Sequence, residues 1–222
     1  DTFRPFVDRF GQFAHDDWPG KIHSEDELLK AGEREAAWLE ANAAGPAADR
    51  NAWGGWTAGP QLKATGHFRT DKVDGKWWLV DPGGRLFFSH GVDCVGYGAE
   101  TGVKYREGYF AWLPEEGSPF ARFYGSGHWA PHGFYKDKGT FKTFDFAGAN
   151  LLRKHGECWH EKFRELAHRR IRAWGLNTVG NWSDHRVYQM RRTPYTATLN
   201  TDSPKIAGSS GWWGKFPDPF AP

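Results

Sequence analysis

An alternation of helix-like and strand-like patterns in residues 159–200 constrains the fold of this chain more than any other feature. Six apolar residues recur there at the spacing of one helical face: Trp159, Phe163, Leu166, Ala167, Ile171 and Trp174. Gly175 then stands where a helix C-cap belongs, and "LNTVGNW" at 176–182 has the pattern of a strand. A short helix at about 185–192 and a further strand, "YTATLN", follow. Strands joined through helices in this way build parallel sheets with right-handed crossovers.

A second group of strands is expected in "GHFRTDKVDGKWWLVDPGGRLFFSHGVD" at 66–93. Two turn signals, Asp74-Gly75 and the run at 81–84, divide this segment into three strands. The third strand, 86–92, is apolar on both faces at its start, which favours a buried parallel strand over an edge strand.

The N-terminal part is expected to combine an irregular strap with one helix. Residues 1–23 are aromatic and irregular. Ser24 and Glu27 then form a capping box, so a helix should begin there and end at Gly45-Pro46.

Polar side chains gather where the expected parallel strands end: Ser89, His90, Asp93, Asn181, Asp184, Asn200 and Asp202. This pattern is typical of a (β/α)₈ barrel, whose chemistry lies at the carboxyl ends of its strands. We therefore predict an α/β chain that forms the N-terminal part of a TIM barrel, preceded by a small β-rich ancillary region. The ancillary region should span 1–84, and 85–222 should hold the first three β/α units, with a long aromatic loop at 96–157. A full barrel needs roughly 250 residues, so this barrel is expected to be incomplete.

Composition excludes several classes of partner. The formal net charge is only +2 and no basic stripe occurs, so nucleic acid is not an expected partner. No apolar run approaches the ~20 residues of a membrane span, and no signal peptide is recognised, as would also hold for a mature secreted chain. Cys94 and Cys158 are too few for a disulfide framework. Aromatic residues make up 17% of the chain, an excess that hints at a surface for stacking sugars.

No cofactor or metal ion is expected from the motifs. His155 and His160 in "HGECWHE" lie five residues apart, which does not place them on one helical face. The segment "GSGHWAPHG" lacks the strand–loop–helix setting and the Lys of a phosphate-binding loop, and no G-x-S-x-G nucleophile motif occurs.

Four segments resemble the β-agarases of glycoside hydrolase family 50: "FVDRFGQFAHDDWPGKI", "GGWTAGPQLKATGHFRTDKVDGKWWLVDPGGRLFFSHGVD", "WGLNTVGNWSD" and "FPDPF". The likeness runs through nearly all of the chain and keeps its order. The block around "KWWLVDPGG" is the more specific part, because other (β/α)₈ glycosidases carry strings like "WGLNTVGNWSD".

The resemblance implies a β-rich, carbohydrate-binding-like region joined to a catalytic barrel that cleaves β-1,4 bonds of agarose with retention. It also implies two catalytic glutamates at the ends of the fourth and seventh barrel strands, downstream of the "DPF" region. No catalytic residue is therefore assigned in this chain, which we expect to be inactive alone. Secretion or a periplasmic location is expected with such a substrate.

Candidate sugar-binding residues come from the strand ends and the aromatic excursion: His90, Asp93, Asn181, Trp182, Asp184, Asn200 and Trp129. Each has a plainer interpretation. Asp184 is placed to cap the following helix, and Asp93 could form a salt bridge instead. His90 could make a structural hydrogen bond, Trp182 could pack the barrel top, and the rings of 96–157 could form a small core of their own.

Three hypotheses remain open from the sequence. The first is a retaining β-agarase-like hydrolase acting on agarose or a related red-algal galactan, of which this chain supplies one wall of the cleft. The second is a galactan-binding protein without chemistry. The third is one half of a two-chain hydrolase, because a three-strand piece of a barrel exposes apolar edges and should need a partner.

Overall fold

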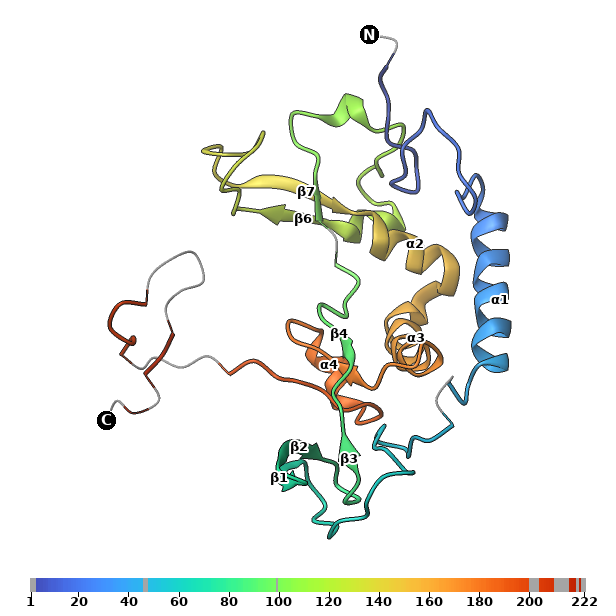
Figure 1. Ribbon diagram of the computed structural model, residues 1–222. Coiled ribbons are helices and arrows are strands. Elements are labelled where there is room, and N and C mark those ends of the chain that lie inside the picture. The colour runs from blue at the N-terminus through green and yellow to red at the C-terminus, as the bar shows by residue number, and fades with distance from the viewer. Residues whose placement is uncertain are drawn as a thin grey trace.

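The structure is a computed structural model, and it describes residues 3–45, 48–98, 100–199, 204–209, 216–218 and 220. Within these ranges the architecture is mixed α/β, with two antiparallel sheets, one parallel strand pair and a set of helices along one side (Figure 1).

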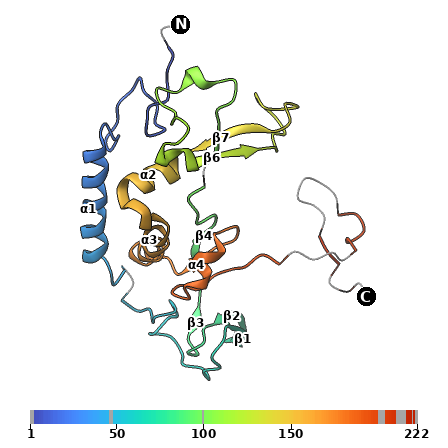
Figure 2. The same ribbon diagram turned by 180° about the vertical axis from the view of Figure 1, so that it is seen from behind.

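The N-terminal strap and helix form as the sequence predicts. Helix α1 (Glu25–Ala41) begins at Ser24, whose Oγ accepts the N–H of Glu27 at 3.1 Å. The helix ends at Ala41, before the expected Gly45. It runs along the outside of α2 (Phe146–His155) and α3 (Trp159–Ala173), as Figure 2 shows from behind.

The first antiparallel sheet has the order β1-β2-β3. Strands β1 (Arg69–Val73) and β2 (Lys76–Val80) form the hairpin expected at Asp74-Gly75. Both turn residues are left-handed, with φ +50° and +78°, which is the requirement of a type I′ turn. Strand β3 (Leu86–Phe87) pairs antiparallel with β2.

The expectation of one continuous parallel strand at 86–92 is wrong. The segment divides into β3, which belongs to the antiparallel sheet, and β4 (Gly91–Val92), which pairs in parallel with β8 (Thr178–Val179). The chain passes from one sheet to the other between these two strands. An apolar run shows that a segment is buried, but it does not show where the segment changes its pairing partner.

The expectation of a long aromatic loop at 96–157 is also wrong. This segment folds into a second antiparallel sheet of order β5-β7-β6 (Glu100–Gly102, Phe141–Asp145 and Tyr124–Gly127) and continues into α2. Three 3₁₀ helices accompany it: Glu107–Tyr109, Pro119–Phe123 and Gly156–Cys158. Its rings fill a core in which Phe144 is fully buried and Trp159 of α3 is 4% exposed. The aromatic excess therefore serves, in part, a core of its own.

The strand–helix–strand pattern after residue 157 is present. Helix α3 buries Phe163, Leu166 and Ile171 as the helical spacing predicts. Strand β8 follows, and then α4 (His185–Gln189), which is shorter than expected. In the predicted strand "YTATLN", the described residues 195–199 show one parallel bridge, between Tyr195 and Val179.

Two further observations concern the described part of the chain. Cys94 and Cys158 are both free and exposed. None of the described helices is both long enough and apolar enough to span a membrane.

Candidate strand-end site

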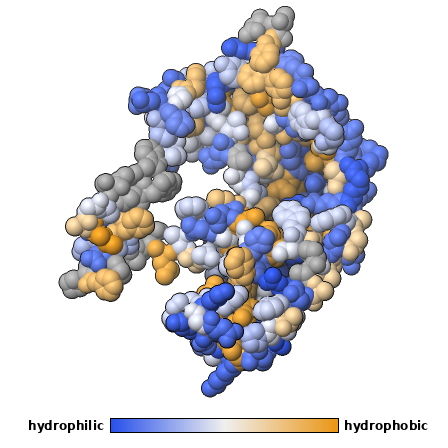
Figure 3. All heavy atoms as spheres, viewed as in Figure 1, coloured by the Kyte–Doolittle hydropathy of each residue, from blue (hydrophilic) through white to orange (hydrophobic). Residues whose placement is uncertain are grey.

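Three parallel segments give the candidate site its frame. Gly91 pairs with Thr178 and Val92 with Val179, and Val179 also bridges Tyr195 in parallel. Because the strands are parallel, the residues that follow each of them lie at the same end of the strand pair. Figure 1 shows β4 in the middle of the molecule beside α4. Figure 3, which has the same view, shows hydrophobic residues at the surface in this middle part.

Asp93 joins the ends of the two paired strands. Its Oδ1 accepts the N–H of Asn181 at 2.9 Å, and the N–H of Cys94 donates to the Asn181 carbonyl at 2.9 Å. The approach is close: a Cβ at Gly180 would lie 2.0 Å from Asp93 Oδ1. The structure thus brings Asp93 and Asn181 together, through a backbone hydrogen bond in place of the expected salt bridge.

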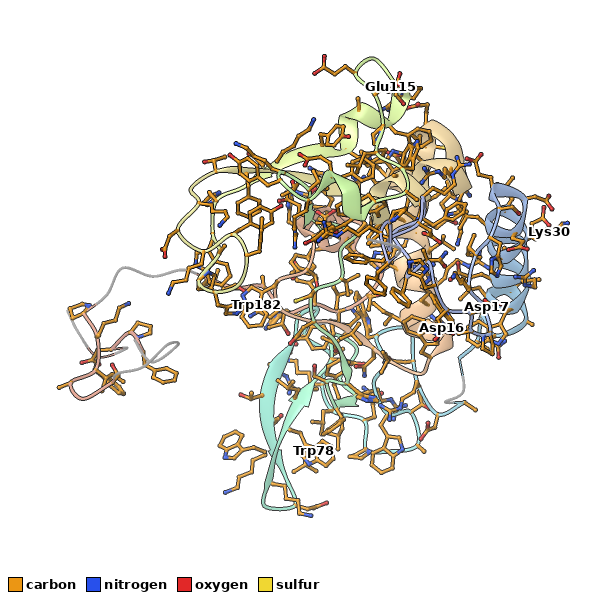
Figure 4. All side chains as sticks on the ribbon, turned by 90° about the horizontal axis from the view of Figure 1, so that it is seen from above. Asp16, Asp17, Lys30, Trp78, Glu115 and Trp182 are labelled. Carbon is orange, nitrogen blue, oxygen red and sulfur yellow. The ribbon has the colours of Figure 1, made fainter. Side chains whose placement is uncertain are left out.

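Asn181 and Trp182 follow β8 directly. The Thr198 hydroxyl donates to Asn181 Oδ1, which fixes the amide side chain. Trp182 has a left-handed backbone, with φ +56°, and is 63% exposed. Such a conformation costs a bulky residue on the order of 1–3 kcal/mol, and residues of this kind cluster at functional sites. Figure 4 shows Trp182 far from Trp78 of the β1–β2–β3 sheet.

Asp184 takes the structural role that the sequence also allowed. Its Oδ1 accepts the N–H of Arg186 at 3.0 Å and caps α4, and its own N–H donates to the Val95 carbonyl at 2.9 Å. Ser183 completes this corner, because its Oγ accepts the N–H of Val95 at 2.9 Å and donates to the Gly180 carbonyl at 2.8 Å.

The structure does not place His90 with Asp93 at the end of a strand, and its role as a sugar contact stays a prediction. His90 comes before β4, and alternation along a strand puts it on the same face as Val92, opposite Asp93. Ser89 lies on the Asp93 face, since its hydroxyl hydrogen-bonds that of Thr178 at 2.9 Å. The difference follows from the division of the segment 86–92 into two strands.

The structure does not place the two remaining candidates, Trp129 and Asn200, at this site. Trp129 is 71% exposed in the segment between β6 and β7, in the second antiparallel sheet. Asn200 lies outside the described residues, as does Asp202.

Sequence reasoning missed Asn177, which holds the start of β8 against the preceding chain. Its Oδ1 accepts the N–H of His90 at 2.8 Å, and its Nδ2 donates to the Phe88 carbonyl at 2.9 Å. The sequence did hold a signal for this role, because Asn177 stands at the start of the predicted strand and its amide can donate and accept hydrogen bonds at once. Tyr188 was also missed; its hydroxyl donates to the Gly180 carbonyl at 2.9 Å and its ring stacks on Tyr195.

The chemistry available here is hydrogen bonding and stacking. Asp93 and Asp184 each have a carboxylate oxygen engaged by a backbone N–H. Asn181 and Trp182 offer an amide and an exposed ring beside Asp93. Among the described residues, no group of three or more His, Cys, Asp or Glu side chains is arranged to hold a metal ion.

Comparison with known proteins confirms the predicted resemblance. No family model matches the chain. Beta-agarase B of Vibrio sp. (strain JT0107) is 36% identical over 243 residues, covering 99% of this chain and 25% of that protein. Beta-agarase A of the same strain is 30% identical over 241 residues, covering 99% of this chain and 23% of that protein. The chain thus spans about a quarter of the length of these curated relatives.

Solved structures agree in fold and in coverage. An agarase, AgWH50C, matches with a TM-score of 0.80 and 31% identity, covering 99% of this chain and 34% of that one. The protein PfGH50B gives 0.80 and 32%, with coverage of 99% and 34%. An exo-beta-agarase gives 0.82 and 32%, with coverage of 100% and 36%. The chain therefore corresponds to a part of such enzymes.

Proposed function

We propose that this chain, which matches a quarter to a third of the β-agarases that it resembles, is part of a β-agarase-like glycoside hydrolase of family 50. The enzyme would cleave β-1,4 bonds of agarose or a related red-algal galactan with retention. The observation that carries the proposal is the similarity over 99% of the chain, both in sequence and in structure.

The proposed role of β4, β8 and the Tyr195 bridge is that of the first three strands of a catalytic (β/α)₈ barrel. Two parallel connections support this role: the chain runs from β4 through α3 to β8, and from β8 through α4 to Tyr195. The remaining strands would come from polypeptide beyond these 222 residues, in the same chain or in a second one.

The proposed sugar contacts lie beside the strand ends: Asp93 and Trp182, which are exposed, and Asn181, which is half-buried. A retaining glycosidase needs two carboxyl groups ~5–5.5 Å apart, one as nucleophile and one as acid. Asp93 and Asp184 are held in place by backbone N–H groups at Asn181 and Arg186. We therefore place the catalytic pair outside this chain, whose part is to form one wall of the cleft.

Affinity electrophoresis in agarose tests the binding role. The purified chain should migrate more slowly with agarose in the gel, and Trp182→Ala should abolish most of the retardation. The matched control is Trp174→Ala, which removes a similarly exposed ring (54% against 63%) at the end of α3. Equal retardation of both variants and the parent chain would remove Trp182 from the site.

A reducing-sugar assay tests whether the catalytic carboxyl groups lie outside this chain. The chain alone should release no sugar from agarose, and addition of polypeptide that completes the barrel should restore hydrolysis. Release by the chain alone would show that the catalytic carboxylates lie within it. Agarose binding with no hydrolysis under either condition would instead support a galactan-binding protein.

We also propose a secreted or periplasmic location for the enzyme, which is consistent with a polymeric substrate.

A further inference from the structure

A cavity of about 260 Å³ lies at the other end of β8 from Asn181. Its walls come from residues 44–45 and 50–54 after α1, from the C-terminal part of α3 with the loop that follows, and from 192–194. Asn177 lines this cavity and precedes β8, whereas Asn181 follows β8. The cavity and the strand-end site therefore lie at opposite ends of β8.

The side chains around this cavity are strongly basic. Four arginines from three separate segments line it: Arg50, Arg169, Arg172 and Arg192. Arg169 pairs with Glu40 at 3.0 Å, and Arg50 lies 3.7 Å from Asp49. Within the described ranges, Arg172 and Arg192 have neither a hydrogen-bond partner nor an ion-pair partner for their guanidinium groups. The cavity thus carries positive charge that the described residues leave uncompensated.

The C-terminus of α3 accounts for only part of this charge. Cations in a last helical turn are favourable because they face the negative end of the helix dipole. Arg172 lies in that turn, and Arg169 lies one turn earlier on the same helix. Arg50 and Arg192 belong to other segments, so the helix dipole does not explain why they converge on the same cavity.

One residue that lines the cavity, His168, is buried and is held by two hydrogen bonds. His168 is 6% exposed, with Nε2 3.2 Å from the Val187 carbonyl and Nδ1 2.8 Å from the Thr193 hydroxyl. A carbonyl only accepts, so Nε2 carries the proton and Nδ1 accepts from Thr193. Burial, together with the charge of Arg192, lowers the pKa of His168 despite the Val187 hydrogen bond. The positive charge at the cavity therefore comes from the arginines.

Gly45 and Gly54, which lie in the described residues after α1, fit closely against the end of α3 and the start of β8. Gly45 and Gly54 are left-handed, with φ +74° and +87°. A Cβ at Gly45 would lie 2.6 Å from the Arg172 carbonyl oxygen, and one at Gly54 would lie 2.5 Å from Asn177 Cβ. Glycine at both positions lets the chain approach closely and form a wall. Trp53 lies in this wall and is 41% exposed.

We propose that this cavity is a second carbohydrate site, which takes a sugar unit carrying a sulfate or carboxylate group. Guanidinium groups match the oxygens of such anions in paired hydrogen bonds, and Arg172 and Arg192 have free donors for them. The ring of Trp53 offers an apolar face for the sugar. The volume suits one or two sugar units, at the small end of ligand pockets. The sugar part of the inference rests on the proposed function, whereas the anion part rests on the arginines alone.

Calorimetric titration with matched oligosaccharides tests the proposal. The probes are a sulfated galactan oligosaccharide, the same oligosaccharide desulfated, a uronate-containing oligosaccharide of equal length, and inorganic sulfate. The sulfated or the uronate probe should bind at least about tenfold more tightly than the desulfated one, and which of the two binds identifies the anion. Equal affinity for the desulfated probe, or inorganic sulfate binding as tightly as the whole oligosaccharide, would overturn the proposal.

Substitutions of the residues that line the cavity test whether the anionic probe binds there. Arg172→Gln and Arg192→Gln should each weaken binding of the anionic probe about tenfold, while Arg34→Gln, an exposed change on α1, should leave it unchanged. Trp53→Phe, which retains a ring, should weaken it less than Trp53→Ala. Trp182→Ala should leave it intact, so loss of agarose retardation and loss of anionic binding can be told apart. Unchanged affinity in both Arg172→Gln and Arg192→Gln would refute the site, and circular dichroism checks that each variant is folded.

Discussion

At the scale of single residues, the close contact between Gly180 and Asp93 holds the candidate sugar site together. A side chain at 180 would enter the space of Asp93 Oδ1 and would also lie 2.8 Å from the Val92 carbonyl oxygen. The Asp93 carboxylate depends on this space, because it reaches across to the N–H of Asn181. The absence of a side chain at 180 is therefore a condition for the register of both strand ends.

Gly180→Ala should lower the free energy of unfolding by about 2 kcal/mol, since an overpacked contact next to a carbonyl and a carboxylate must move backbone. Urea unfolding followed by tryptophan fluorescence measures the change. Gly108→Ala is the matched control, because a Cβ there meets nothing within 4 Å. A loss at Gly180 no greater than at Gly108 would show that the strand ends adapt without the Asp93 contact.

At the scale of elements, Glu35 connects α1 to the two helices behind it. Its Oε1 accepts a 2.6 Å hydrogen bond from Arg170 Nε of α3, and its Oε2 lies 3.8 Å from Lys154 Nζ of α2. Burial alone would raise the pKa of Glu35, but the hydrogen bond and charge of Arg170 outweigh burial and hold that pKa below its ordinary value. The ionised form is therefore favoured by folding.

A carboxyl whose pKa is depressed by folding stabilises the protein above its unfolded pKa, and that contribution disappears as the pH falls through the folded pKa. Glu35→Gln should thus be less stable than the parent chain at pH 7, and the difference should shrink as the pH falls below about 4.5. Unfolding curves between pH 7 and pH 3 measure it, with Glu33→Gln, an exposed change on the same helix, as the reference. A difference that does not vary with pH would assign the loss to packing.

Elements with local signals were predictable, and elements that depend on distant pairing were not. The capping box at Ser24, the apolar spacing of α3 and the Asp74-Gly75 turn all formed as expected. The β5-β7-β6 sheet was missed, because its strands are separated by up to about forty residues and because β5 and β6 are short and contain Gly in place of an alternating apolar pattern. At the candidate site, the proximity of Asp93 and Asn181 was predictable because the ends of parallel strands coincide. His90 was misplaced because the sequence does not show that the chain changes sheets before β4.

At the scale of the whole molecule, α3 connects the parts that position the strand-end site. Trp159 at its start packs into the core of the second antiparallel sheet. Leu166 in its middle lies in a cluster with Leu39 of α1. Ile171 near its end packs against Val179 of β8. A single helix thus fixes the strand pair relative to both the N-terminal helix and the second sheet.

Among the strands that the structure describes, the sheet edges at β1 and at β4 differ in how they are protected. The β1 edge carries Arg69, Asp71 and Lys72, and charges on an edge strand oppose pairing with another chain. At β4, the carbonyls of His90 and Val92 both accept from the segment 177–180, so the backbone groups of Gly91 point to the other side. Of the strands that the structure describes, only β8 pairs with β4. This edge is uncharged, and the remaining strands of the proposed barrel would add there.

The β4 edge should therefore make the chain associate with itself when no other strand covers it. Sedimentation velocity over a wide concentration range should show a mass that rises above the 25.2 kDa of one chain. Val92→Lys should bring the mass back toward one chain, because Val92 is 37% exposed and a charge there opposes pairing while its own ladder to β8 persists. Thr70→Lys adds the same charge to the protected β1 edge and should change nothing. A parent chain that stays at the mass of one copy throughout would mean that the β4 edge is already blocked, and polypeptide completing a barrel would then have to add elsewhere.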